Sequence, residues 1–468
     1  MPSAVLIASL MLAASAASVA LPAEPASPRI EADVRAVLHR DHVPGAAIAI
    51  LRDGHPVYMK AFGLRDIDSH RAVTFDTHFE IGSITKQFTA AAILQLKEAG
   101  KLDLDAKLAT YLPDAPHAGE VTLRQLLSHT SGLPEYLGDP DSDASITRPA
   151  TYAQLMARIA GKPLEFPPGS HWSYCNTGYI LLGRVVEVVS GESYRHYLQS
   201  HFFDPMGMKQ TFTVADEGRL PDMAVGYRTE AGKMRRAPTI ADSVGWSAGN
   251  IVSTVADLAR WSEAVAAGKI VDAGDYIAMS TSIATTKGED TGYGFGLFVD
   301  TIEDQPRVGH TGGSLGFTTA DEYFPKQKTR IIAFTNSGDS PEAGEILSNA
   351  VFDDLFPDVA AAALAPAAGE DPARTTDARA MFGQIQRGDE DPSRLGAHLA
   401  AKFKDGLGKR LAGAYAAYGA PTAFIYRGHR SADGLAWYDY VVRFGPGSVL
   451  KFGIGLDDAG KIASLSFG

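Results

Sequence analysis

The stretch FEIGSITKQFT, residues 79–89, determines how the rest of the chain is interpreted, because it places a hydroxyl and an amine three residues apart. Apolar residues recur at helical spacing after Ser83, and no Pro or Gly follows until Gly100, which predicts a helix over residues 84–99. Residues three apart share one face of a helix, so the Lys86 amine can reach back to the serine oxygen. A serine becomes nucleophilic when a nearby base takes its proton, and burial or positive charge makes an amine such a base.

The motif alone does not decide the function, because Ser448 and Lys451 repeat it near the carboxyl end. The second copy lies in an apolar stretch that predicts a strand, where positions three apart point to opposite faces. For Ser83 taken alone, a capped helix start with a surface lysine explains the pattern equally well. The distinction depends on partners elsewhere in the sequence.

The composition is that of a globular protein: 468 residues, 45% hydrophobic and 21% charged, enough for roughly two or three domains. The net charge of −12 and the lack of a basic run argue against nucleic acid as a partner. Residues 1–20 are apolar, uncharged and end in small residues, although no Lys or Arg opens them. They predict a signal peptide, a periplasmic or secreted location, and no stable membrane span after cleavage.

Apolar runs and turn signals predict an α+β protein. Residues 45–51 and 57–62 flank Asp53-Gly54 and predict a hairpin, while residues 223–250 are predicted to be rich in loops and residues 293–299 to form a glycine-interleaved strand. The predicted domains are 29–357, an Ala- and Pro-rich linker at 358–376, and 377–468. The last contains predicted helices 378–387, 392–405 and 409–418, then strands 422–426, 437–444, 448–456 and 461–467.

Two further short patterns contain residues that could take part in catalysis or substrate binding. Tyr174 offers a hydroxyl that can pass protons, and Asn176 offers an amide that can orient a substrate or the lysine. A loop tyrosine before a turn-making asparagine explains the pair at least as well. Residues 309–314 form a glycine-rich strand edge that lets a substrate backbone approach and exposes an oxyanion donor. The alternative for this edge is a bulge beside a turn.

Taken in order along the chain, three signatures stand out: Ser83-x-x-Lys86, Tyr174-x-Asn176 and His310-Thr311-Gly312. Together they resemble the signatures of penicillin-recognising serine hydrolases. The branch most similar contains class C β-lactamases, D-alanyl-D-alanine carboxypeptidases, D-aminopeptidases and related esterases, and the likeness covers residues 30–355. It implies a two-lobed β-lactamase/transpeptidase-like fold, with an antiparallel sheet, flanking helices and a helical lobe, and the site between the lobes.

The resemblance implies a role for each signature residue. Ser83 is the nucleophile, and Lys86 and Tyr174 share proton transfer, with the choice of base left open. The amides of Ser83 and Gly313 form the oxyanion hole. The implied substrate-binding residues are Asn176, His310, Thr311 and Gly312. No cofactor and no metal is implied, the partner is a small-molecule or peptide substrate, and a homo-oligomer is left open.

Two positions depart from the family pattern. The third signature often begins with a lysine, a fixed cation, whereas His310 is mostly neutral at pH 7 if its pKa is near ~6.5. This favours a peptidase or esterase over a β-lactamase. Cys175, the only cysteine, stands where serine or alanine is usual; it excludes an internal disulfide and is interpreted as a small buried filler.

The predicted function is therefore a serine hydrolase that forms an acyl-enzyme with a small amide, a D-amino acid-type peptide or an ester. One alternative is a β-lactamase proper, and another is a catalytically silent penicillin-binding-fold sensor. The Gly-Trp-Ser-Ala-Gly run around Ser247 fits the α/β-hydrolase elbow, but a poor strand precedes it and the next helix starts too late. Residues 377–468 resemble, less closely, a nuclear-transport-factor-2-like cone with an accessory role.

Overall fold

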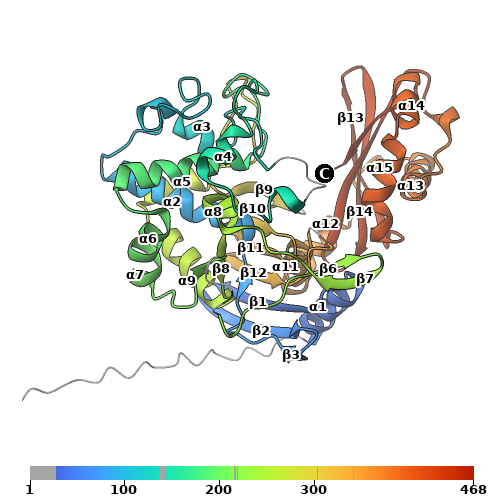
Figure 1. Cartoon of the computed structure of the whole chain (residues 1–468). Helices are drawn as coiled ribbons and strands as arrows, with labels where there is room; N and C mark the ends of the chain where they lie inside the picture. Colours follow the sequence, from blue (N-terminus) through green and yellow to red (C-terminus); the bar gives the residue numbers. More distant parts are fainter. Residues whose placement is uncertain are drawn as a thin grey trace, which may run out of the picture.

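The chain folds into a large α+β part followed by a smaller one (Figure 1). The structure is a computed structural model that describes residues 28–137, 143–214, 218, 220–302, 304–340 and 342–467. The predicted signal peptide, residues 1–20, lies outside the described residues. Among the helices described, none combines the length and the apolar character needed to cross a membrane.

A seven-stranded antiparallel sheet forms the centre of the large part, in the order β3-β2-β1-β12-β11-β10-β9. The strands are β1 (Gly45–Arg52), β2 (His55–Asp66), β3 (Arg71–Ala72), β9 (Phe298–Ile302), β10 (Gln305–Gly313), β11 (Thr318–Phe324) and β12 (Thr329–Thr335). β1 is buried on both faces, with Ile48 in one core and Ala49 in the other, which explains its nearly continuous apolar sequence. The hairpin predicted at Asp53-Gly54 joins β1 to β2, and both turn residues have positive φ.

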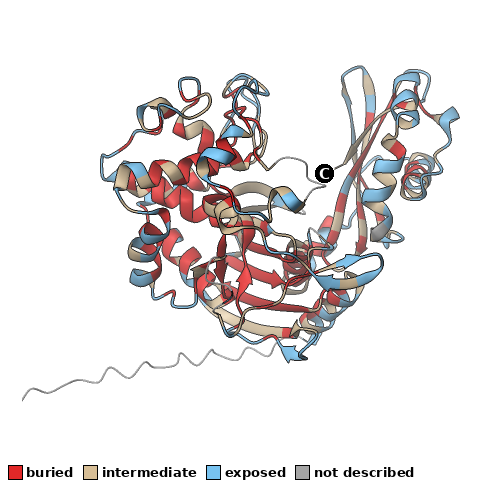
Figure 2. Ribbon diagram, viewed as in Figure 1, coloured by how far each residue is buried: buried red, intermediate tan, exposed pale blue. Residues whose placement is uncertain are grey.

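Helices cover both faces of this sheet. α1 (Pro28–Arg40) and α11 (Ala343–Leu355) pack on one face and share its core. The other face supports a helical lobe, and Figure 2 shows buried residues concentrated in the sheet and in the helices of this lobe. The lobe contains α2 (Thr85–Glu98), α3 (Leu123–Leu127), α4 (Tyr152–Ala157), α5 (Asn176–Ser190), α6 (Tyr194–Leu198), α7 (Asp204–Met206), α8 (Asp242–Gly249), α9 (Val255–Ala266) and α10 (Ala273–Met279).

Two predictions of local structure are wrong. Residues 223–250, predicted to be loop-rich, contain α8 and the hairpin β6 (Tyr227–Glu230)–β7 (Lys233–Arg236). Ion pairs hold this exposed hairpin, such as that between Arg228 and Asp143 at 2.5 Å, so its sequence lacks the apolar alternation of a buried strand. Residues 293–299 are mostly a tight turn, and β9 begins only at Phe298.

Two short strands, β4 (Phe79–Glu80) and β5 (Phe212–Thr213), pair with β8 (Ile251–Ser253).

The C-terminal part has its own hydrophobic core between three helices and a four-stranded antiparallel sheet. Its elements are α13 (Pro372–Arg387), α14 (Ala397–Lys404), α15 (Leu407–Tyr415), β13 (Ala423–Ala432), β14 (Leu435–Gly445), β15 (Ser448–Leu456) and β16 (Ile462–Phe467). The Ala-rich segment before it carries α12 (Pro357–Ala363) and the start of α13, since alanine favours helix and proline suits the first turn. The sheet docks on α11, where a Cβ atom on Gly447 would lie 1.9 Å from the Ile346 oxygen.

Candidate active site

Ser83 lies in a 3₁₀ turn, Gly82–Ile84, that leads directly into α2. β9 pairs with β10 only as far as Gly309, and beyond that point the turn packs against the open edge of β10. A Cβ atom on Gly82 would lie 2.7 Å from the Gly313 nitrogen, and one on Gly312 would lie 1.9 Å from the carbonyl oxygen that precedes the turn. Glycines thus allow the main chain of the turn to lie beside that of Gly313, the arrangement that an oxyanion hole requires.

The Lys86 side chain is fully buried, and its amine faces Ser83. Its Nζ lies 3.0 Å from the Ser83 Oγ, 2.8 Å from the Asn176 Oδ1 and 2.8 Å from the Ala248 carbonyl oxygen. Burial lowers the pKa of Lys86 to about 7, against a smaller opposing effect of the Glu135 carboxylate. An amine with this pKa is neutral in about half of the molecules at pH 7, so it can accept the serine proton.

Tyr174 lies over the same amine: the Lys86 Nζ is 4.8 Å from the centre of the tyrosine ring. The Tyr174 hydroxyl is buried, and it interacts with the Ser83 hydroxyl. Burial raises the pKa of Tyr174, and the Ser83 hydroxyl acts in the opposite direction. A phenol with a raised pKa keeps its proton at neutral pH, so this group is better suited to donate a proton than to remove the first one.

Asn176 begins α5, and Glu135, a residue that the sequence analysis missed, fixes its orientation. The Glu135 Oε2 accepts hydrogen bonds from the Asn176 main-chain nitrogen at 2.8 Å and from its Nδ2 at 3.1 Å. Because Nδ2 donates to Glu135, the amide oxygen of Asn176 faces Lys86. Glu135 directly follows the Ser-His-Thr-Ser-Gly-Leu-Pro run at 128–134, and this proximity is the only sequence signal that marks it.

His310 is buried on β10, and both of its ring nitrogens are engaged. Nδ1 lies 2.5 Å from the Thr311 carbonyl oxygen, which can only accept, so Nδ1 carries the proton. In the neutral ring, Nε2 then accepts from the Tyr293 hydroxyl at 3.0 Å. Burial and the charge of Lys86 lower the pKa of His310 to about 3. The start of the third signature is therefore uncharged at neutral pH, and Tyr293, also missed from the sequence, holds its tautomer.

A second buried histidine, His129, lies in the same aromatic cluster, with its ring centre 4.3 Å from that of Tyr174 and 4.7 Å from that of Tyr293. Its Nδ1 accepts the main-chain N–H of Cys175 at 3.1 Å, which leaves the proton on Nε2. Burial and the charge of Lys86 lower the pKa of His129, so this ring is also neutral. The Cys175 side chain is buried and burial raises the pKa of its thiol to about 12, in agreement with a filler.

Ser247, the serine of the competing elbow pattern, is buried within α8, and its Oγ donates to the Tyr179 carbonyl oxygen at 2.9 Å. No strand leads into it, which excludes the elbow interpretation. Trp246, immediately before it, has φ 30° and ψ −125°, a backbone conformation that residues other than glycine rarely adopt. This turn directs the Ala248 carbonyl oxygen toward Lys86.

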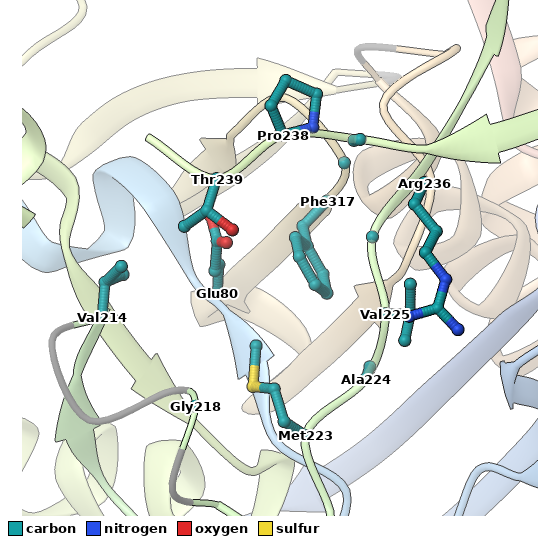
Figure 3. Close-up of a pocket in the computed structure, with 13 residues that line it drawn as sticks. Glu80, Val214, Gly218, Met223, Ala224, Val225, Arg236, Pro238, Thr239 and Phe317 are labelled. Atoms are coloured by element: carbon teal, nitrogen blue, oxygen red, sulfur yellow. The ribbon is translucent and has the colours of Figure 1, made fainter. Parts of the chain in front are cut away.

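A cavity of about 430 Å³ lies beside the site (Figure 3). Its wall includes Glu80, three residues before Ser83, and Gly316, three residues after Gly313. Three residues span at most about 11 Å, so these two wall residues lie within that distance of Ser83 and Gly313 respectively. Figure 3 shows the Phe317 ring beside the cavity. None of the signature residues lines this cavity.

Away from the site, the carboxylates of Glu98, Asp272 and Asp275 lie within 4.8 Å of one another, the one such acidic or histidine-containing group in the described part of the chain. They join the end of α2 to the start of α10, where Asp272 accepts the Asp275 main-chain N–H at 2.7 Å and thereby caps the helix. This capping arrangement accounts for their proximity, and the group lies more than two helical turns from Lys86.

Comparison with known proteins identifies the family. Residues 30–355 match the beta-lactamase family. The chain belongs to this family. It is 31% identical to penicillin-binding protein 4 of Amycolatopsis lactamdurans, over 67% of this chain and 84% of that protein. It is 29% identical to the D-aminopeptidase of Brucella anthropi, over 66% of this chain and 59% of that protein.

The fold of this beta-lactamase-family chain is also similar to solved structures. The crystal structure of the D-amino acid amidase from Ochrobactrum anthropi SV3, complexed with L-phenylalanine, superposes with a TM-score of 0.60 and 25% identity, covering 71% of this chain and 98% of that one. The likeness agrees with the predicted two-lobed β-lactamase/transpeptidase-like fold, with its antiparallel sheet, flanking helices and helical lobe. The resemblance drawn from the three signatures is confirmed.

Proposed function

We propose that this chain is a serine hydrolase that forms an acyl-enzyme on Ser83 and acts on small amides, D-amino acid-type peptides or esters. The observation that carries the proposal is the 3.0 Å hydrogen bond between the Lys86 Nζ and the Ser83 Oγ, made by a buried amine whose pKa is lowered to about 7. The relatives named D-aminopeptidase and D-amino acid amidase support the substrate class.

In the proposed reaction, neutral Lys86 takes the Ser83 proton while the serine oxygen attacks the substrate carbonyl carbon. The negative charge that forms on the carbonyl oxygen is stabilised by the amides of Ser83 and Gly313. Tyr174 then donates its proton to the departing amine or alcohol as the carbon–leaving-group bond breaks, and it regains a proton from the Lys86 ammonium. A water molecule attacks the acyl-enzyme through the same groups in reverse, which releases the acid and restores the serine.

Substrate binding is assigned to Asn176 and to the strand residues His310, Thr311 and Gly312. Within the described part of the chain, the Asn176 Nδ2 makes one hydrogen bond, to Glu135, so its second proton can be donated to a substrate carbonyl. Because the His310 ring is neutral, this wall offers no fixed cation to a substrate carboxylate. That argues for amides and esters over β-lactams, and β-lactamase activity proper remains the alternative. We assign the acyl side of the substrate to the cavity beside Glu80 and Phe317.

The proposal is tested by labelling with a fluorescent fluorophosphonate, comparing the wild-type chain with Ser83→Ala and Ser247→Ala. We expect the wild type and Ser247→Ala to be labelled and Ser83→Ala to be unlabelled; labelling of Ser83→Ala contradicts the mechanism. Turnover is then compared on D-alanine p-nitroanilide, a p-nitrophenyl ester and nitrocefin. Nitrocefin turnover far above the other two favours the β-lactamase alternative, and labelling without turnover of any substrate favours the silent sensor.

We also propose that residues 1–20 direct export. Fractionation of cells that produce the chain with and without these residues tests this, and retention of the full chain in the cytoplasm contradicts it.

A further inference from the structure

Glu135 occupies an unusual place for a carboxylate in this site: it lies in the loop after α3 and binds the start of α5. Its two oxygens accept four N–H groups, two from Asn176 and, on Oε1, the main-chain nitrogens of Tyr136 at 2.8 Å and Leu137 at 3.1 Å. Four acceptor positions are all that a carboxylate offers, so Glu135 has none left for a substrate. Its contacts therefore act on the site through Asn176.

The amide of Asn176 can adopt two orientations that differ by a half-turn, and Glu135 selects one. A carboxylate accepts only, so the Nδ2 side of Asn176 turns to Glu135 and the oxygen turns to the Lys86 Nζ, 2.8 Å away. In the reverse orientation an N–H group would face the lysine amine, and that amine would lose an acceptor. The orientation of the only side-chain amide that contacts Lys86 among the described residues thus depends on a residue 41 positions away.

Glu135 is also the source of negative charge at Lys86. The other titratable groups that face the amine are neutral at pH 7, because burial raises the pKa of each phenol and of the thiol and lowers that of each histidine. These groups are Tyr174, Cys175, Tyr179, His129 and His310.

We propose that Glu135 is a positioning residue that holds the Asn176 amide toward Lys86 and supplies the negative charge facing that amine. Its carboxylate favours the ammonium form, so its loss makes Lys86 give up its proton at a lower pH. The inference rests on the proposed function for its effect on turnover, but its effect on Lys86 does not require turnover.

The decisive experiment follows the titration of Lys86 by NMR in the full chain labelled with lysine ¹³Cε, with the resonance assigned from Lys86→Arg. In Glu135→Gln the glutamine keeps the size but loses the charge, and we expect the midpoint to fall by about 1 pH unit. The matched control is Glu187→Gln on α5, the helix that Asn176 begins. The Glu187 carboxylate also accepts a main-chain N–H, from Tyr194 at 3.1 Å, and its replacement should leave the midpoint unchanged. Glu135→Asp keeps the charge and should keep the midpoint near that of the wild type.

Turnover gives the second readout. In Glu135→Gln, kcat should fall at least tenfold and the acidic limb of the pH–kcat/KM profile should move down with the NMR midpoint. An unchanged midpoint in folded Glu135→Gln overturns the inference, and so does a loss confined to KM, which would mean direct contact with substrate. If Glu135→Gln does not fold, a lowered midpoint in Glu135→Asp overturns it instead. If the wild type neither labels nor turns over, the proposed function fails while the NMR titration still decides this inference.

Discussion

The chain contains the Ser-x-x-Lys pattern twice, and the two copies differ in secondary structure, in the arrangement of the two side chains and in the burial of the lysine. Ser83 and Lys86 lie on one face of the turn into α2, with their polar atoms 3.0 Å apart and the amine buried. Ser448 and Lys451 lie on β15, where the serine is buried and the lysine exposed. The pattern places a base beside a nucleophile only where the secondary structure aligns the two side chains and the fold buries the amine.

The largest expected difference between the copies is the change in kcat when the serine of each copy is replaced. Ser83→Ala should lower kcat for ester hydrolysis by at least about 10⁴-fold, because no acyl-enzyme can form. Ser448→Ala should leave kcat near that of the wild type. Both variants are measured by steady-state kinetics with p-nitrophenyl esters. Substantial turnover by Ser83→Ala, or a comparable loss in Ser448→Ala, would contradict the conclusion that only the first copy is catalytic.

Replacing Lys86 should change activity and stability in opposite directions, whereas replacing Lys451 should change neither. Lys86→Met removes the proposed base and should lower kcat by about 10³-fold, within the range for general base catalysis. It should also raise Tm, because removing the desolvation cost of the buried amine outweighs the loss of its hydrogen bonds to the Asn176 and Ala248 oxygens. Lys451→Met changes an exposed side chain and should alter neither quantity. Kinetics and calorimetry measure the two effects, and a fall in Tm for Lys86→Met would contradict the burial argument.

The lowered pKa of Lys86 predicts the pH dependence. Only the neutral amine can take the serine proton, so kcat/KM should rise about tenfold per pH unit below pH 7 and level off above it. The unfolded chain holds this proton up to a pKa near 10.5, so it binds more protons than the folded chain between about pH 7 and 10.5. The contribution of Lys86 to stability therefore increases with pH across that window, and it should disappear in Lys86→Met. Denaturant unfolding at several pH values checks this sign.

The parts of the structure that were predictable from sequence have local signals. The apolar spacing after Ser83 marks α2, Asp53-Gly54 marks the first hairpin, and β15 has the predicted bounds. The polar surroundings of Lys86 have no such signal, because Asn176 is 90 residues away and the Ala248 carbonyl 162 residues away. The chemistry of Asn176 offered an amide that could orient a substrate or the lysine, and the family resemblance placed it in the same site as Lys86.

Glu135, Tyr293 and His129 were missed for the same reason. Each acts on the site through contacts with residues distant in the sequence, and no periodicity of a helix or strand records such contacts. The hairpin β6–β7 was missed because ion pairs, rather than an apolar face, fix its position.

A smaller loss of kcat/KM is expected when the Tyr293 hydroxyl, which donates to the His310 ring, is removed. Tyr293→Phe removes the donor to the His310 Nε2 and leaves a buried acceptor without a partner. A cost of about 1 to 2 kcal/mol, or a five- to thirtyfold loss in kcat/KM, is expected. The control is Tyr440→Phe on β14, the strand that pairs with the second copy, which should leave kcat/KM unchanged. Equal kinetics for Tyr293→Phe and wild type would show that the tautomer of His310 does not matter to the reaction.

The smallest expected effect on activity comes from the residue next to the second serine. Gly447 has a φ of 65° and presses against α11, where a Cβ atom would lie 1.9 Å from the Ile346 oxygen and 2.5 Å from the Ala350 nitrogen. Gly447→Ala should therefore loosen the docked sheet and lower Tm, at a cost of about 1 to 3 kcal/mol. Its kcat at 25 °C should stay at the wild-type value, because no described contact of the signature residues reaches the C-terminal sheet. A parallel loss of kcat, in a variant that circular dichroism shows to be folded, would mean that the second copy's surroundings help to build the first copy's site, and the two regions could no longer be treated as independent.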